Sequence, residues 1–293
     1  MSLLKRALPL VALALSACLT LGSKPVEPVV IATPKPVIAL VLGGGAAKGF
    51  AHIGVIKALE AQGIVPDIVV GTSAGAVVGS MYAAGKNGFE LQTLAIALDE
   101  SQVSDWSLPD RGVLKGEALA TFINKAVGNA GIEKFPKKFG AVATDLASGE
   151  PIIFRSGDAG MAVRASSSVP GIFQPVAIRG REYVDGGLVA PVPVRFARDM
   201  GATFVIAVDI SNKPANGKTK SSLEVLMQTF AIMGQSLNRH ELPQADIVIR
   251  PDISQLASAY FKTRHQAVLE GEKAAAKEMA TLKSKLEQSR ERR

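Results

Sequence analysis

Short apolar runs alternate with segments of helical periodicity along most of this chain. Residues 37–42 form a continuous apolar run rich in β-branched side chains, which predicts a buried strand of a parallel sheet. After the glycine-rich segment 43–49, apolar residues recur at helical spacing in residues 51–61. A second short strand is predicted at 67–70 and a helix of small residues at 74–84. This order of elements predicts an α/β fold.

The same alternation continues towards the C-terminus. Further strands are predicted at residues 140–144, 152–154, 204–208 and 247–249, and further helices at 117–127, 192–200, 223–237 and 266–293. The segment 213–222 is polar and carries proline, glycine and lysine, so it predicts an exposed loop.

The N-terminal segment has a different pattern. Lys5 and Arg6 precede an apolar stretch at residues 7–17, which predicts a secretory signal peptide over residues 1–17. A transmembrane helix is the alternative, but the stretch is shorter than the ~20 residues that span a bilayer. The sequence Leu-Ser-Ala before Cys18 resembles the bacterial lipobox, in which the cysteine is lipidated. The alternative is an incidental cysteine near an ordinary cleavage site.

These patterns predict four parts of the chain. A signal peptide covers residues 1–17, a lipid-anchored, proline-rich tether 18–36, the folded domain 37–250 and a C-terminal helical extension 251–293. Lipidation of Cys18 would anchor the protein in the bacterial cell envelope. Because a leucine and not an acidic residue follows Cys18, we expect the outer membrane, on the periplasmic side.

Composition and charge exclude several classes of protein. The chain of 293 residues has one cysteine and three histidines, which excludes an internal disulfide and a multi-cysteine metal site. The formal net charge is +7, but residues 262–293 hold nine Lys/Arg against five Glu, and two further cations lie in the signal. The folded body is therefore nearly neutral, which argues against a nucleic-acid-binding protein.

A serine motif stands between a predicted strand and a predicted helix. Residues 71–75 read G-x-S-x-G with Ser73 at the centre, and this strand–turn–helix context is typical of a nucleophile elbow. The alternative is that Ser73 only caps the helix that follows.

The glycine-rich segment 43–49 lies between the first strand and the first helix. Lys48 is followed by Gly49 where a Walker A motif needs Ser or Thr, and neither register fits a dinucleotide fingerprint. Such a loop can instead direct several backbone N–H groups at one point, as an oxyanion hole does. A plain tight turn is the alternative.

A nucleophilic serine needs a base. His52, His240 and His265 do not stand at a strand end beside a matching acid, so each is a weak candidate. Asp185 follows a short apolar stretch and precedes two glycines. A carboxylate in this position can accept the serine proton if burial raises its pKa towards neutrality.

The glycine loop ending in Lys48-Gly49, the G-x-S-x-G motif and the D-G-G motif at 185–187 together resemble the patatin-like phospholipases, which use a Ser–Asp dyad. Blocks at residues 143–150, 168–176 and 191–194 resemble the bacterial branch of that family, and the resemblance covers about residues 37–210. One departure is Ala46, where many relatives carry glycine.

The resemblance implies a lipid acyl hydrolase with a three-layer α/β/α fold and a mainly parallel central sheet. It implies Ser73 as nucleophile, Asp185 as general base, a lipid substrate, and no metal or other cofactor. It further assigns Gly44, Gly45 and Ala46 to the oxyanion hole and gives supporting roles to Lys48, Gly71, Gly75, Gly186 and Gly187.

Two other functions remain open at this point. The chain could be an envelope lipoprotein that binds lipids or partners without turnover, or an esterase with a Ser-His-Asp triad. Residues 223–237 and the region around Trp106 could admit lipid, although an ordinary helix and a surface loop explain them as well.

Overall fold

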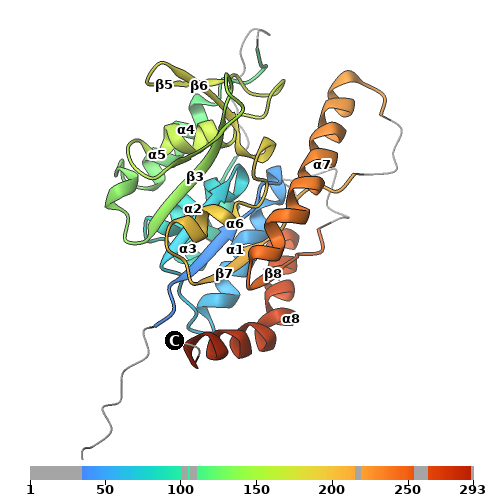
Figure 1. Cartoon of the computed structure of the whole chain (residues 1–293). Helices are drawn as coiled ribbons and strands as arrows, with labels where there is room; N and C mark the ends of the chain where they lie inside the picture. Colours follow the sequence, from blue (N-terminus) through green and yellow to red (C-terminus); the bar gives the residue numbers. More distant parts are fainter. Residues whose placement is uncertain (1–34, 100–104, 106–110, 215–218, 254–262, 292–293) are drawn as a thin grey trace, which may run out of the picture. The chain divides into compact units, whose positions relative to one another are not determined.

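A mixed sheet runs through the middle of the described structure (Figure 1). This computed structural model describes residues 35–99, 105, 111–214, 219–253 and 263–291, all within one unit that spans Pro34–Arg293. The predicted signal peptide, Cys18, most of the tether and Trp106 lie outside the described residues.

The strands of the sheet follow the order β5-β6-β3-β2-β1-β7-β8, and β4 pairs with β3 beside this path. The parallel strands are β1 (Ile38–Leu42), β2 (Ile68–Thr72), β3 (Lys138–Asp145), β7 (Phe204–Val208) and β8 (Ile247–Ile249). At the other edge, β4 (Pro151–Phe154), β5 (Val176–Ile178) and β6 (Arg181–Asp185) pair in antiparallel fashion. The predicted α/β fold with a mainly parallel sheet is therefore confirmed.

Helices cover both faces of this sheet. They are α1 (Phe50–Glu60), α2 (Ala74–Ala83), α3 (Gly88–Ala97), α4 (Glu117–Ala126), α5 (Ala159–Ser166), α6 (Val194–Asp199), α7 (Ser222–Glu241) and α8 (Arg264–Glu291). In the described ranges, no helix has both the length and the apolar character needed to cross a membrane.

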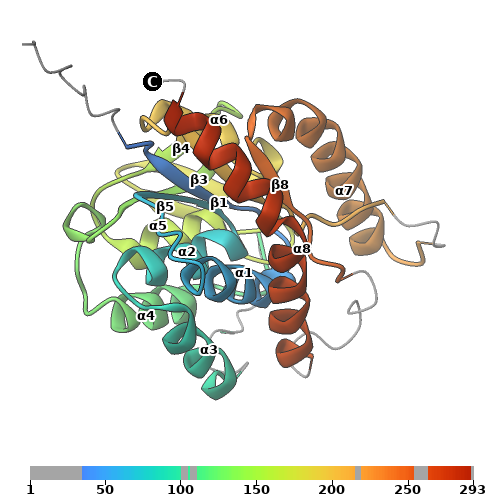
Figure 2. The same ribbon diagram turned by 90° about the horizontal axis from the view of Figure 1, so that it is seen from below.

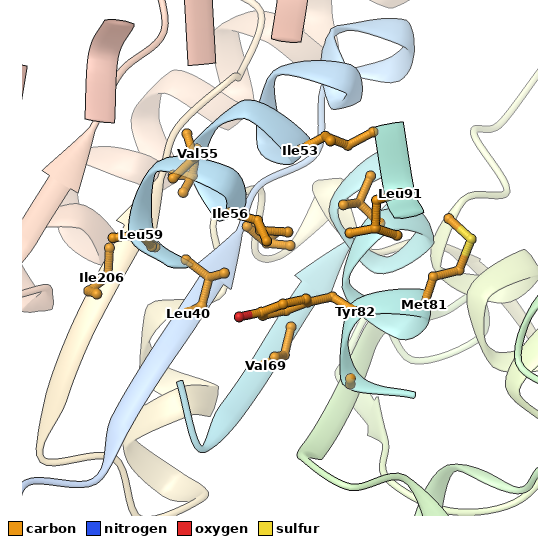
Figure 3. Close-up of a cluster of buried hydrophobic side chains, with 14 of the residues drawn as sticks. Leu40, Ile53, Val55, Ile56, Leu59, Val69, Met81, Tyr82, Leu91 and Ile206 are labelled. Atoms are coloured by element: carbon orange, nitrogen blue, oxygen red, sulfur yellow. The ribbon is translucent and has the colours of Figure 1, made fainter. Parts of the chain in front are cut away.

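Alternation along the central strands separates two cores. Leu40 and Leu42 of β1 face a large cluster with α1, α2, α3 and α8, and Figure 3 shows Leu40 close to side chains of α1 and α2. Ala39 and Val41 face the opposite side, where α6 contributes Phe196 to a second cluster. Side chains of successive strand residues point to opposite faces, so both faces of β1 are buried.

The C-terminal helix α8 packs along α1, as Figure 2 shows from below. The contact is close because glycines stand on both helices. A Cβ on Gly54 would lie 1.9 Å from the carbonyl oxygen of Val268, and one on Gly271 would lie 2.0 Å from that of Ala51. The residues at 264–291 thus belong to the same compact unit as the sheet.

Some elements differ from the sequence prediction. The patterns did not predict α3, α5 or the antiparallel pair β5–β6. The helix predicted at 192–200 begins only at Val194, because Pro193 holds the N-cap position outside the helical conformation. The remaining predicted strands and helices match the observed ones to within a few residues.

Parallel pairing places the ends of three strands side by side. Leu42 of β1 is opposite Gly71 of β2 on one side and Val208 of β7 on the other. The loop after β1 and the turn after β2 therefore leave the sheet at the same edge. This is the edge at which ligands bind in open α/β sheets.

Candidate active site

Ser73 occupies a sharp turn between β2 and α2. Its backbone has φ 53° and ψ −122°, a left-handed region that costs a non-glycine residue on the order of 1–3 kcal/mol. A Cβ on Gly75 would lie only 1.9 Å from the carbonyl oxygen of Leu42, so only glycine allows the turn to approach β1. The predicted elbow is present at this point.

The capping interpretation of Ser73 is wrong. Ser73 stands at the N-cap position of α2, but its side chain makes no capping hydrogen bond. Its carbonyl oxygen accepts from the N–H groups of Ala76 and Val77, so the backbone starts the helix. The hydroxyl is left available for another role.

Asp185 ends β6 and is almost fully buried, with 7% of its surface exposed. Its Oδ1 accepts a hydrogen bond of 2.6 Å from the N–H of Gly187, while Oδ2 makes no hydrogen bond within the described structure. Burial raises the pKa of Asp185 to about 6, against the opposing influence of the Gly187 N–H and the Ser73 side chain. A carboxyl with this pKa can serve as a base near neutral pH.

The Ser73 side chain and the Asp185 carboxyl are neighbours. The Ser73 side chain lowers the pKa of Asp185, as a hydrogen-bonding neighbour does, yet no hydrogen bond of ordinary geometry reaches Oδ2. The pair is therefore adjacent, but no hydrogen bond joins Ser73 to Asp185 Oδ2 in the described structure. Catalytic hydrogen bonds are often long in unliganded enzymes and shorten when substrate binds.

Two hydroxyl residues hold this pair in place and are not marked by any motif in the sequence. The Ser166 Oγ accepts from the N–H of Ser73 at 2.9 Å. Thr144 donates to the carbonyl oxygen of Asp185 at 2.8 Å. Both bonds link residues far apart along the chain, so no local pattern could have revealed them.

The glycine loop lies directly beside the serine. A Cβ on Gly44 would lie 3.3 Å from the Cβ of Ser73, whereas one on Gly45 would lie 2.6 Å from the carbonyl oxygen of Ile210. In this structure the N–H of Gly44 donates to Pro191 at 2.9 Å, so that donor is occupied. Among the described residues, the N–H groups of Gly45 and Ala46 have no hydrogen-bond partner.

Ala46 stands at a position whose backbone conformation favours glycine. It has φ 51°, which lies in the left-handed region that favours glycine. The alanine adopts this conformation nonetheless, so the loop keeps a left-handed residue at this position without a glycine.

The supporting residues take separate places. Lys48 donates from Nζ to Asn212 at 2.7 Å, and its pKa is lowered by burial and by the charge of Lys213. A Cβ on Gly186 would lie 2.1 Å from the carbonyl oxygen of Val142, and one on Gly187 would lie 2.8 Å from Asp185 Oδ1. A Cβ on Gly71 would likewise lie 2.5 Å from the N of Ala76.

The histidines do not join the pair. His52 is fully buried in α1, its Nε2 lies 2.8 Å from the carbonyl oxygen of Gly43, and burial lowers its pKa to about 4. The ring is therefore neutral, and Nε2 donates to the glycine loop. His240 and His265 are exposed on α7 and α8.

Comparison with known proteins agrees with these motifs. The chain is 37% identical over 183 residues to an uncharacterized NTE family protein of Mycobacterium tuberculosis, covering 61% of this chain and 51% of that protein. It is 36% identical over 179 residues to lysophospholipase NTE1 of Coccidioides immitis, covering 59% and 11%. The chain thus spans about half the length, or less, of these relatives.

A solved structure and a family model also match this chain. The crystal structure of VipD from Legionella pneumophila matches with a TM-score of 0.48 and 15% identity, over 86% of this chain and 67% of that one. The model of the patatin-like phospholipases matches residues 40–198, which hold the glycine loop, Ser73 and Asp185. This chain belongs to the patatin-like phospholipase family.

Proposed function

We propose that this protein hydrolyses carboxylic esters of phospholipids with Ser73 as nucleophile and Asp185 as general base. One observation carries the proposal: a serine in a strained turn stands next to a buried carboxylate whose pKa is about 6. A carboxyl with an ordinary pKa would be a weak base for a hydroxyl. Burial therefore gives Asp185 the proton affinity that the dyad needs.

The reaction would proceed in two halves. Ser73 Oγ attacks the ester carbonyl carbon while Asp185 takes the hydroxyl proton, and the tetrahedral intermediate then breaks the ester C–O bond. The alcohol leaves with the proton from Asp185. Water next attacks the acyl-enzyme, gives a proton to Asp185, and the fatty acid leaves as Ser73 recovers its proton.

The negative oxygen of the intermediate needs donors. The N–H groups of Gly45 and Ala46 are free for it in the described loop, and the Gly44 N–H would join them only after its bond to Pro191 opens. Each such donor is worth roughly 10²–10³ in rate. The start of α2 adds the positive end of a helix dipole close to Ser73.

The alternatives receive less support from the described residues. A Ser-His-Asp esterase needs a histidine between the serine and the acid. His52 is engaged with Gly43, and His240 and His265 are exposed on other elements. A non-catalytic lipid-binding role would leave the strained turn and the raised pKa of Asp185 without a purpose.

Hydrolysis of a short-chain acyl ester by purified variants tests the proposal. Ser73→Ala and Asp185→Asn should each lose activity by three orders of magnitude or more, on the order of what triad residues contribute. The exposed residues Ser156 and Asp199 offer matched controls, so Ser156→Ala and Asp199→Asn should keep full activity. Full activity in either dyad variant, or loss only in His240→Ala, would reject the dyad.

We further propose that the chain is anchored in the cell envelope by lipidated Cys18, a residue outside the described ranges. The lipobox-like sequence and the proline-rich segment after it support this. Labelled palmitate should enter the wild-type protein but not Cys18→Ala, and the variant should leave the membrane fraction. Labelling of Cys18→Ala would contradict the anchor.

A further inference from the structure

A hollow lies one strand beyond the glycine loop, at the ends of β7 and β8. Its walls are the loop after β7, the last turns of α7 with the short turn that follows, and the residues at the end of β8. Its volume is about 520 Å³, which is large enough for a polar headgroup. We call it the α7 hollow.

The charged side chains of the α7 hollow are mostly cationic. Lys213, Arg239 and Arg250 line it, and Asp209 is the one carboxylate among the described residues of the lining. Asp209 Oδ2 lies 3.5 Å from Arg250 Nε, so it offsets that cation in part. Lys213 and Arg239 are exposed and have no ion pair among the described residues. This excess of positive charge favours the binding of an anion in the hollow.

A buried polar atom of the same hollow lacks a partner. Asn238 lines the hollow and is only 6% exposed. Its Nδ2 donates to Ser211 Oγ at 2.9 Å, but its Oδ1 makes no hydrogen bond within the described structure. A buried acceptor without a donor costs about 1–3 kcal/mol, which a ligand hydroxyl could recover if the Asn238 amide turns to present this oxygen to the hollow.

The α7 hollow is joined to the candidate active site by direct contacts. Asn212 of its lining accepts from Lys48 at 2.7 Å, and Lys48 belongs to the glycine loop. On the strand side, the N–H of Gly43 donates to the carbonyl oxygen of Val208, and the ends of β1 and β7 lie side by side there. Asp209, the residue after Val208, lines the hollow. A ligand seated in the hollow would therefore lie next to the loop that holds the ester oxygen.

The helix above the hollow also has an apolar surface. Val225, Ile232 and Met233 of α7 are each about half exposed. Exposed apolar side chains on the same helix as the cationic Arg239 fit a molecule that has both acyl chains and an anionic headgroup. They do not fit a small, fully polar phosphate ester as well.

We propose that the α7 hollow binds the phosphate and hydroxyl groups of a polyol phosphate ester, as the headgroup of the lipid substrate. Arg239 and Lys213 would hold the phosphate, and Asn238 Oδ1 would accept from a headgroup hydroxyl after the amide turns towards the hollow. This proposal rests on the proposed function, because it takes the ligand to be the substrate. Free glycerol 3-phosphate carries the same phosphate and hydroxyl groups but no acyl chains.

Titration calorimetry on the Ser73→Ala chain tests binding without turnover. The ligands are short-chain phosphatidylglycerol below its micelle concentration, diacylglycerol with the same acyl chains, and glycerol 3-phosphate. We expect the phospholipid to bind more tightly than either other ligand. Adding Arg239→Gln or Lys213→Gln should weaken its binding about tenfold, because each removes a charge-assisted hydrogen bond.

Arg155→Gln is the matched control, since Arg155 is exposed beyond β4, at the opposite side of the sheet. It should leave the affinity unchanged. Unaltered phospholipid affinity in both Arg239→Gln and Lys213→Gln would overturn the site. Equal binding of glycerol 3-phosphate with the same dependence on Arg239 would overturn the lipid as its source. Because binding is measured without hydrolysis, neither result bears on the Ser–Asp dyad.

Discussion

The backbone N–H of Ser73 donates a 2.9 Å hydrogen bond to the hydroxyl of Ser166, which in turn donates to the carbonyl oxygen of Val142 at 2.6 Å. Ser73 has φ 53°, so its strained turn is held from outside by a residue of α5. Ser166 is fully buried and lies 93 residues further along the chain. We infer that it positions the nucleophile without touching the ester.

Ser166→Ala should therefore lower kcat by about tenfold with little change in KM, because a lost buried acceptor costs about 1–3 kcal/mol. Steady-state kinetics on a short-chain ester, corrected for active sites by a fluorophosphonate titration, checks this. Ser166→Thr keeps the hydroxyl and should recover part of the loss. A role in folding alone would reduce the number of titrated sites but leave kcat per site unchanged.

The pKa of Asp185 sets the pH dependence of the proposed reaction. The base works only when ionised, so kcat/KM should rise through pH 6 and then level off above it. A pH profile of the wild-type enzyme measures this inflection. If it instead moves or vanishes in His240→Ala while Asp185 is intact, a histidine and not Asp185 is the base.

Asp185→Asn should make the protein more stable at neutral pH although it is inactive. Burial raises the pKa of this carboxyl from 3.8 to about 6, so the folded state holds the proton more tightly than the unfolded chain. Stability is therefore lost as pH rises from about 4 to about 6, by up to about 3 kcal/mol. The neutral amide escapes that loss.

Urea unfolding at pH 8 and at pH 4 checks this prediction. The variant should exceed the wild type at pH 8, and the difference should disappear near pH 4, where Asp185 is protonated. Asp199→Asn, at an exposed position, should show no such difference. Equal stability of Asp185→Asn and wild type at pH 8 would mean that the buried Asp185 carboxylate does not destabilise the folded state.

His52 should produce the opposite pH dependence. Its pKa falls from 6.5 to about 4 on burial, so the folded state binds the proton less well than the unfolded chain. The stability that comes from the neutral His52 is fully present above pH 6.5. As pH falls towards 4, the free energy of unfolding drops by about 3 kcal/mol. His52→Gln should remove this loss, because the amide does not titrate.

Two variants of His52 also test how its side chain supports the glycine loop. The Gln side chain can donate to the carbonyl oxygen of Gly43 as the histidine does, whereas Leu cannot. We expect His52→Gln to keep most of the esterase activity and His52→Leu to lose about tenfold, from the unpaired buried carbonyl. Equal activities of the two variants would show that this hydrogen bond does not orient the loop.

The sequence predicts the parts of this site that depend on local geometry. Ser73 and Asp185 stand in short motifs at strand ends, where glycines mark the backbone conformation. Ser166 and Thr144 stand in no motif, because their role arises only from contacts between distant segments. Likewise, the bond from Gly44 to Pro191 depends on how two loops meet and cannot be read from either.

The contact between α1 and α8 allows a test of the fold at a single position. A Cβ on Gly271 would lie 2.0 Å from the carbonyl oxygen of Ala51, a distance that the backbone must increase by moving. Gly-to-Ala inside a helix otherwise stabilises by up to about 1 kcal/mol. Gly271→Ala should instead destabilise the protein by about 1–3 kcal/mol or more, as overpacking does.

Gly234 in α7 is the matched control, since a Cβ there would meet Pro191 at 3.4 Å, an ordinary contact distance. Gly234→Ala should be neutral or stabilising, so the two substitutions should differ in sign in the same thermal or urea unfolding experiment. Because α8 also contacts β8, the loss in Gly271→Ala should appear in the single unfolding transition of the whole domain. A separate early transition would show instead that α8 detaches without disturbing the sheet that carries Ser73.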